Sequence, residues 1–194
     1  MNIAVDQWPK DHLINVDEYY RMVQAGMLAP DARVELFEGK VIDRAPIGSR
    51  HAGTVNKLSR LFSRVIGEQA VLSLQSPVRL SDRSEPQPDI SLLKPRADYY
   101  GKSHPTPADV LLLIEVSDTT LQFDRGQKLA LYAKHSIPEV WVVDLENNQL
   151  HCMREPDSET GGGSYRSTIS LHPSQNVAVA ALPDVRIELA ALFE

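Results

Sequence analysis

The stretch 110-VLLLIEVSDTTLQFDRGQKLALYAKHSIPEVWVVD-144 predicts a strand, a helix and a second strand in close succession. Residues 110–116 form a nearly continuous apolar run, which is typical of a strand buried on both faces of a sheet. Residues 123–134 have helical spacing, and residues 139–144 are again mostly apolar. Because strands and helices alternate here, we predict an α/β fold built on a mixed sheet.

The rest of the chain predicts further helices and strands around this unit, from capping residues and hydrophobic periods. Before it we expect a helix over 15–29 capped by Asn15 or Asp17, a hairpin of strands 33–37 and 40–42, a helix over 49–67, strands over 71–80 (irregular at Pro77) and 89–93, and a polar surface segment at 94–109. After it we expect a hairpin of strands 150–153 and 165–169 with a flexible glycine-rich tip at 161–163, then a strand and a closing helix within 182–193.

Length and composition fit a single domain over residues 1–194, with a loose segment at 1–14 and a C-terminal hairpin and tail at 145–194 packed on the core. No apolar run approaches the roughly 18 residues that span a bilayer, and the N-terminus lacks the pattern of a secretory signal. The single cysteine, Cys152, excludes an internal disulfide and a cysteine-rich zinc site. We therefore expect a cytoplasmic protein without membrane contact.

Two carboxylates are placed at the ends of predicted strands. Glu115 ends the buried strand, where a carboxylate must be neutral, paired with a cation or bound to a metal ion. Asp89 starts the strand 89–93, and the two would meet if these strands lie side by side in opposite directions. Two carboxylates with a backbone carbonyl and waters form a typical Mg²⁺ site. The alternatives are a structural ion pair or a solvent-reaching strand end for Glu115, and a turn or strand-capping role for Asp89.

Lys128 lies on the helix that follows, on one face with Asp124, Leu131, Tyr132 and His135. Leu131 and Tyr132 mark this face as inward, so we expect the Lys128 amine to point toward the sheet and the carboxylates. A lysine there could orient an attacking water or stabilise negative charge on a phosphorus centre. The alternative is a salt bridge to Asp124, one turn away.

Five parts of the chain together resemble the Uma-type restriction endonucleases, a bacterial family within the PD-(D/E)xK nuclease superfamily. They are VELFEGKV (34–41), His51, QPDI (87–90), LLLIEVSDTT (111–120) and FDRGQKLALYAKHSIPEVWVVD (123–144). The resemblance extends from about Tyr19 to Phe193 and is most specific in the middle third of the chain. It implies a restriction-endonuclease-like core, in which helices flank a mixed β-sheet.

The resemblance also implies catalytic residues. Asp89 matches the motif aspartate, Glu115 matches the motif glutamate, and Glu35 matches an acidic residue on an early strand. The superfamily has a lysine two positions after the glutamate, where this chain has Ser117. In this family the lysine belongs to the following helix, where Lys128 matches.

His51 matches a histidine near the start of a helix, and the resemblance gives it an accessory place in the site. The alternative is a hydrogen-bonded core histidine, because His51 projects with the apolar face of its helix. Glu35 also has alternatives, since it could face solvent or pair with Arg33 or Lys40.

The implied activity is that of a Mg²⁺- or Mn²⁺-dependent endonuclease that hydrolyses phosphodiester bonds in DNA. Asp89 and Glu115 would hold the metal ion with the Val116 carbonyl. Lys128 would position the nucleophile, and Glu35 would anchor Lys128 or complete a second metal site. A homodimer would supply the two active sites that cutting two strands requires. The alternatives are an inactive nuclease-fold module that binds nucleic acid or protein, and a metal-dependent hydrolase of smaller phosphate esters.

A basic stripe on the helix 49–67 is a candidate DNA contact, and it comprises Arg50, Lys57, Arg60 and Arg64. These side chains fall within an arc of roughly 80° and would touch the phosphate backbone. The formal net charge of −6 gives this contact no general support, so a solvated helix face is the alternative.

Overall fold

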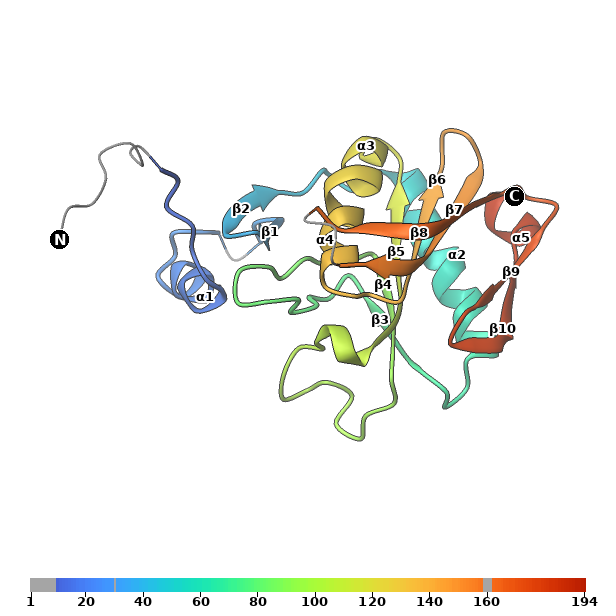
Figure 1. The fold of residues 1–194 in the computed structure, drawn as a ribbon, viewed down its shortest axis with the longest axis horizontal. Coiled ribbons are helices and arrows are strands. Elements are labelled where there is room, and N and C mark those ends of the chain that lie inside the picture. Colours follow the sequence, from blue (N-terminus) through green and yellow to red (C-terminus); the bar gives the residue numbers. More distant parts are fainter. Residues whose placement is uncertain (1–9, 30, 159–161) are drawn as a thin grey trace.

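The computed structural model describes residues 10–29, 31–158 and 162–194, and its centre is a six-stranded mixed sheet (Figure 1). The strands are, in their order across the sheet, β3 (Val71–Leu74), β4 (Ile90–Leu93), β5 (Val110–Ser117), β6 (Glu139–Asp144), β7 (Gln149–Asp157) and β8 (Ser164–Leu171). β5 and β6 are parallel, and the other neighbours are antiparallel. The predicted α/β class with a mixed sheet is confirmed.

The connection between the parallel strands β5 and β6 is helical and packs on one face of the sheet. It comprises α3 (Leu121–Phe123), a π-helical turn η3 (Asp124–Lys128) and α4 (Leu129–Lys134). In η3 the Leu129 N–H donates to the Asp124 carbonyl, five residues back, which is the hydrogen bond of a π-helix. The sequence predicted the helix but not its wide turn.

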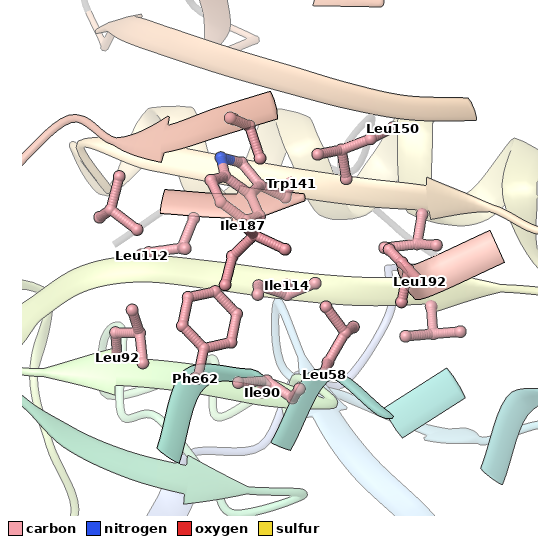
Figure 2. Packing of buried hydrophobic residues seen from close by; sticks show 14 of the residues in the cluster. Leu58, Phe62, Ile90, Leu92, Leu112, Ile114, Trp141, Leu150, Ile187 and Leu192 are labelled. Carbon is pink, nitrogen blue, oxygen red and sulfur yellow. The ribbon is translucent and has the colours of Figure 1, made fainter. Parts of the chain in front are cut away.

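The other face of the sheet is covered by α2 and by the C-terminal elements. These elements are α2 (Ser49–Val65), β9 (Asn176–Val179), β10 (Leu182–Glu188) and α5 (Ala190–Phe193). Figure 2 shows Leu58 and Phe62 of α2 packed toward Ile90 and Trp141 of the sheet, and the Phe62 and Trp141 ring centroids are 5.9 Å apart. Cys152 of β7 belongs to this core, and burial raises the pKa of its thiol to about 12.

The N-terminal part, drawn in blue in Figure 1, comprises α1 (Val16–Gln24) and the hairpin of β1 (Val34–Phe37) and β2 (Lys40–Asp43). Asn15 caps α1 through a capping box with Glu18, as predicted. The predicted end of this helix at residue 29 is wrong, because the chain leaves it at Ala25 and Gly26 follows with a φ of +70°. The predicted hairpin is confirmed, and residues 38–39 of its turn both have positive φ, as a type I′ turn requires.

Three further predictions differ from the structure. The strand predicted over 71–80 ends at Leu74, because Gln75 has a φ of +45° and its N–H donates to the Asp89 carbonyl. β4 begins one residue later than predicted, which leaves Asp89 just before the strand. The 3.6-residue spacing of apolar side chains in the helix 49–67 predicts Val65 on the same buried face as Leu58 and Phe62, but Val65 is 39% exposed in the last turn of α2.

The predicted late hairpin is confirmed by β7 and β8, and the predicted closing strand and helix by β10 and α5. Residues 1–9 of the expected N-terminal segment and residue 161 of the expected glycine-rich tip lie outside the described residues. Gly163 is not part of a free tip, because a Cβ atom there would come within 2.3 Å of the Ala130 carbonyl oxygen. The segment 94–109 contains one short helical turn, η2 (Pro107–Asp109). In the described part of the chain, no helix has the length and apolar character to cross a membrane.

Candidate active site

Asp89 and Glu115 lie next to each other at one end of the central sheet. β4 and β5 are antiparallel, and Ile90 pairs with Ile114, so the residues just beyond this pair reach the same edge. The Val116 N–H donates to Asp89 Oδ2 at 2.9 Å, which fixes the Asp89 carboxylate against β5. Both carboxylates are buried, with Asp89 4% and Glu115 3% exposed. The two carboxylates therefore meet, because β4 and β5 lie side by side in opposite directions, as the prediction required.

The amine of Lys128 joins them from the end of the π-helical turn. Lys128 Nζ lies 3.1 Å from Glu115 Oε1 and 3.5 Å from Glu35 Oε1. The Tyr132 hydroxyl donates to the same Glu115 oxygen at 2.5 Å. Lys128 thus points toward the sheet, as expected from its place on the helix.

Ser117, at the motif position two residues after Glu115, has a structural partner. Its hydroxyl donates to Asp124 Oδ2 at 2.8 Å, and the Thr120 hydroxyl donates to the same oxygen at 2.5 Å. Asp124 is the first residue of η3, so these bonds hold the start of the π-helical turn against the end of β5. The Asp124 carboxylate is thus bound by hydroxyl groups, while the Lys128 amine faces other carboxylates.

Glu35 enters the site from β1 and is 1% exposed. Its Oε2 accepts a hydrogen bond from the Gln87 N–H at 3.0 Å, and its Oε1 faces Lys128. The alternatives considered for Glu35 are wrong. The side chain does not reach solvent, Arg33 donates to a backbone carbonyl, and Lys40 pairs with an aspartate near the N-terminus.

His51 lies in the first turn of α2, with Nε2 3.0 Å from Asp89 Oδ2. Its side chain is 15% exposed and lines the same cavity as the carboxylates. Its Nδ1 is buried and has no hydrogen-bond partner among the described residues. His51 is therefore not a satisfied core histidine. His51 and the Val116 N–H both contact Oδ2 of the Asp89 carboxylate and so fix its position.

Arg44, which follows β2, is a site residue that the sequence analysis missed. Its Nε lies 3.9 Å from Glu35 Oε2, and its Nη2 lies 3.8 Å from Asp89 Oδ1. Its Nη1 donates to the Gln87 side chain at 3.0 Å, and the Arg44 side chain is 13% exposed. The only sequence signal is its position just after the hairpin that carries Glu35. A basic residue after a short strand is too common for this signal to single it out.

Four buried carboxylates meet at this end of the sheet, and we call them the acidic cluster: Glu35, Asp89, Glu115 and Asp124. Lys128 is the buried cation beside them, and Arg44 is largely buried. If all six groups are ionised, two negative charges remain in excess. One divalent cation would neutralise this excess.

The pKa values reflect this excess. Burial raises the pKa of Glu115 to about 8, because the attraction of Lys128 is opposed by the rest of the acidic cluster. Burial also raises the pKa of Asp124. At Asp89 burial has the same direction, but the hydrogen bonds from His51 and Val116 outweigh it and lower the pKa. Burial alone would lower the pKa of Lys128, and the surrounding carboxylates reverse this and raise it.

The donor set of the site fits a hard divalent cation. The short hydrogen bonds of Asp89 fall on Oδ2 and those of Glu115 on Oε1. Asp89 Oδ1 accepts a long hydrogen bond from the Gln75 side chain at 3.4 Å, so Oδ1 and Glu115 Oε2 are the oxygens most available to a ligand. No group of three or more His, Cys, Asp or Glu side chains in the described parts of the chain is arranged to hold a metal ion. A cation here would therefore need backbone carbonyls or waters as further ligands, which Mg²⁺ accepts.

The acidic cluster opens into a cavity of about 810 Å³, within the range of ligand pockets. The cavity lies between the end of the β1–β2 hairpin, the start of α2 and the segment that leads from β5 into η3. All four carboxylates of the acidic cluster line it, as do Lys128, Arg44 and His51. The residues singled out from the sequence for catalysis are thus brought together around one space.

The four residues of the basic stripe are not among those that line this cavity, although their neighbour His51 is. Two of the four contact backbone carbonyls of other segments. Arg50 donates to the Leu145 carbonyl, and Lys57 Nζ lies 3.5 Å from a backbone carbonyl near the C-terminus. Arg60 and Arg64 are exposed on α2. Contact between the basic stripe and nucleic acid remains a prediction.

Comparison with known proteins identifies a family for this chain and a solved structure that shares its fold. The family model "Uma2: Putative restriction endonuclease" matches residues 16–190. No curated protein matches this chain. A crystal structure of a putative nuclease belonging to DUF820 from Anabaena variabilis ATCC 29413 shares the fold, with a TM-score of 0.70 and 17% identity over 93% of this chain and 97% of that chain. Because the family model spans nearly its whole length, the chain belongs to the Uma2 family of putative restriction endonucleases.

Proposed function

We propose that this protein is a metal-dependent nuclease that hydrolyses phosphodiester bonds in DNA. The observation that carries the proposal is the meeting of Asp89, Glu115 and Lys128 inside one cavity at the end of the sheet. Two carboxylates that can hold a cation, beside an amine that can face a phosphate, suit phosphodiester hydrolysis. The family and the nuclease-like fold support the same reaction class.

Asp89 and Glu115, with the Val116 carbonyl, are the residues that would hold the cation, and Mg²⁺ or Mn²⁺ suits their oxygen donors. When bound, such an ion makes a water molecule more acidic and polarises the phosphate. Glu115, whose pKa is about 8 in the metal-free protein, would be kept ionised in this role.

Lys128 would act as a hydrogen-bond donor rather than as a base, because its raised pKa keeps the amine charged. Its ammonium group can orient the attacking water and stabilise negative charge on the phosphoryl oxygens in the transition state. Glu35 would hold the ammonium group in this position, at 3.5 Å. His51 and the Val116 N–H would orient Asp89.

The test is cleavage of plasmid and single-stranded DNA in Mg²⁺ or Mn²⁺ by the wild type, Asp89→Ala and Lys128→Ala. Lys134→Ala is a matched control, because Lys134 lies on α4 with its side chain 51% exposed and paired with Glu38. We expect each site substitution to lower the cleavage rate by about 100-fold or more, and the control to leave it unchanged. Cleavage that survives both site substitutions would show that another site, or another protein, cuts the DNA.

A second candidate function is a nuclease-fold module that binds nucleic acid without cutting it. The observation in its favour is Ser117, which stands at the superfamily's lysine position and is bound to Asp124. A wild-type protein that cuts no DNA and shows no Mg²⁺ binding in calorimetry would favour this function. Mg²⁺ binding without DNA cleavage would instead direct the search to smaller phosphate esters.

A further inference from the structure

The cavity at the acidic cluster has an apolar side as well as a charged one. We call this side the apolar wall, and it comprises Ile42, Pro46, Ile47 and Phe123. Ile47 is 42% exposed, and the Phe123 ring is packed 5.6 Å from the Phe37 ring. An open apolar surface beside buried charges fits a ligand that has both an apolar face and a charged group.

Two cations mark where the charged group of such a ligand would lie. Lys128 and Arg44 both approach Glu35, and each also faces a second carboxylate of the acidic cluster. The Arg44 contacts of 3.8 and 3.9 Å are longer than hydrogen bonds, so its Nε and Nη2 donors are left for an incoming anion. A guanidinium group binds phosphate oxygens well in this way.

The groups that would act on the phosphate are buried side chains of the cavity lining. Asp89, Glu115 and Lys128 are each no more than 4% exposed. In a duplex the bases are paired and stacked inside, so a base cannot pack on the apolar wall while its own phosphate lies at the acidic cluster. An unpaired nucleotide can leave the stack and enter a pocket, as it does in enzymes that act on a base. Its base can then pack on apolar side chains whatever the sequence.

We propose that the cavity binds one unpaired nucleotide, with its phosphate between Arg44 and Lys128 and its base against the apolar wall. The inference rests on the proposed function and narrows its substrate to single-stranded or locally unpaired nucleic acid. It also gives Arg44 a substrate-binding role.

The test measures binding by fluorescence anisotropy in the presence of Ca²⁺, with gel analysis afterwards to confirm that the probe is intact. The probes are a fluorescein-labelled single strand of thymidines, its blunt duplex, and a strand of the same length without bases. The variants are Ile47→Ser in the apolar wall, Arg44→Met at the phosphate position, and Ile169→Ser as a control. Ile169 is 47% exposed on β8, outside the cavity, so it matches Ile47 in residue type and exposure. Circular dichroism confirms that each variant is folded.

We expect the single strand to bind about 10-fold more tightly than the duplex or the baseless strand, given the contribution of one packed base. Ile47→Ser should weaken binding of the intact strand about 10-fold and barely affect the baseless strand. Arg44→Met should weaken both strands alike, because both carry the phosphate. Ile169→Ser should change neither.

Equal binding of single strand and duplex would overturn the inference, as would an Ile47→Ser protein that binds the intact strand as tightly as the wild type. Either result would leave the proposed function standing if the wild type cuts DNA. Base-dependent binding of the single strand without cleavage would support the inference and refute the nuclease. Failure to bind any strand would also overturn the inference.

Discussion

Glu115 and Lys128 depend on each other because each is a buried charge, 3% and 4% exposed. A buried charge that loses its partner destabilises a protein by about 3–5 kcal/mol, whereas removal of both charges is often nearly neutral. Removing one partner and then both therefore separates the contribution of the charge pair to stability from the contribution of side-chain packing.

We predict that Lys128→Met lowers the free energy of unfolding of the metal-free protein by about 3 kcal/mol. The measurement is urea unfolding at a pH above the Glu115 pKa of about 8, where the orphaned carboxylate has to be ionised or take up a proton. Adding Glu115→Gln to Lys128→Met should restore most of the loss. A double variant as unstable as the single one would show that the loss comes from packing or from Glu35, which also faces the Lys128 amine, and not from Glu115.

His151 gives a pH dependence that is independent of the site. Burial lowers the pKa of its ring below 6.5, Arg125 lowers it further, and Asp144 opposes both. Below pH 6.5 the unfolded chain therefore binds a proton that the folded chain does not. The contribution of His151 to the free energy of unfolding should be constant above this pH and should decrease below it, by at most about 1.4 kcal/mol per pH unit, until the folded chain also takes up the proton.

Denaturant unfolding of the wild type and His151→Gln at a series of pH values isolates this contribution, because the other titrating groups, such as Glu115, are common to both proteins. The difference between the two free energies should decrease below pH 6.5, and the difference between the wild type and His172→Gln, at an exposed histidine, should not. Parallel slopes in the wild type and His151→Gln would contradict a lowered pKa of His151.

The sequence predicted the central residues of the site because each one broke a local pattern. Glu115 is a charge at the end of an apolar run, and Lys128 is a charge on an inward helix face. Arg44 breaks no pattern, because its role comes from Glu35 and Asp89, which are 9 and 45 positions away in the sequence. Such a role depends on the folded arrangement and has no local signal.

The π-helical turn η3 is the element that a sequence period describes least well. A period of 3.6 placed Asp124 and Lys128 on one inward face, and both are buried. The wider turn gives them different partners, since Asp124 binds hydroxyls at the end of β5 and Lys128 faces Glu115. Turns of this kind are frequent at functional sites. The additional residue of this π-helical turn therefore sets the direction of the Lys128 side chain relative to Asp124.

Deletion of Gly126 tests this element. Gly126 is exposed, and a Cβ atom there would have no neighbour within 4 Å, so no other part of the protein packs against this side of the turn. Its removal should turn η3 into an α-helical turn and rotate Lys128 by about 100° relative to Asp124. We expect DNA cleavage to fall as far as in Lys128→Ala.

Gly126→Ala is the matched control, because it keeps the length and favours a helix. It should retain cleavage and raise the free energy of unfolding by up to about 1 kcal/mol, measured by thermal unfolding. A deletion variant that cuts DNA at the wild-type rate would show that the neighbouring segments absorb the change.

At the scale of the whole molecule, long-range contacts decide what local patterns cannot. The buried Glu139 carboxylate accepts hydrogen bonds from the Trp141 ring, the Arg154 guanidinium and the Ala180 N–H. It thereby links β6, β7 and the turn between β9 and β10. The sequence predicted most of these strands, but neither their order across the sheet nor this connection, because the partners are far apart along the chain.

The acidic cluster should also make global stability depend on Mg²⁺. A ligand that binds only the folded state stabilises it by about 2.7 kcal/mol at 100 times its dissociation constant. We therefore expect Mg²⁺ to raise the melting temperature of the wild type, compared with NaCl at the same ionic strength. Asp89→Ala should lose this response. Asp17→Ala, which removes an exposed carboxylate from α1, should keep it. An equal rise in Asp89→Ala would place the ion elsewhere on the acidic surface.

The reactivity of Cys152 can report local opening of the central core. It is the sole cysteine of the chain, lies 3% exposed on β7 in the central core, and carries a thiol whose pKa burial raises to about 12. Alkylating reagents react with the thiolate, so they can modify this side chain only when the sheet separates locally or the chain unfolds. The labelling rate under native conditions is therefore a direct measure of how often β7 leaves the core, and it requires no engineered probe.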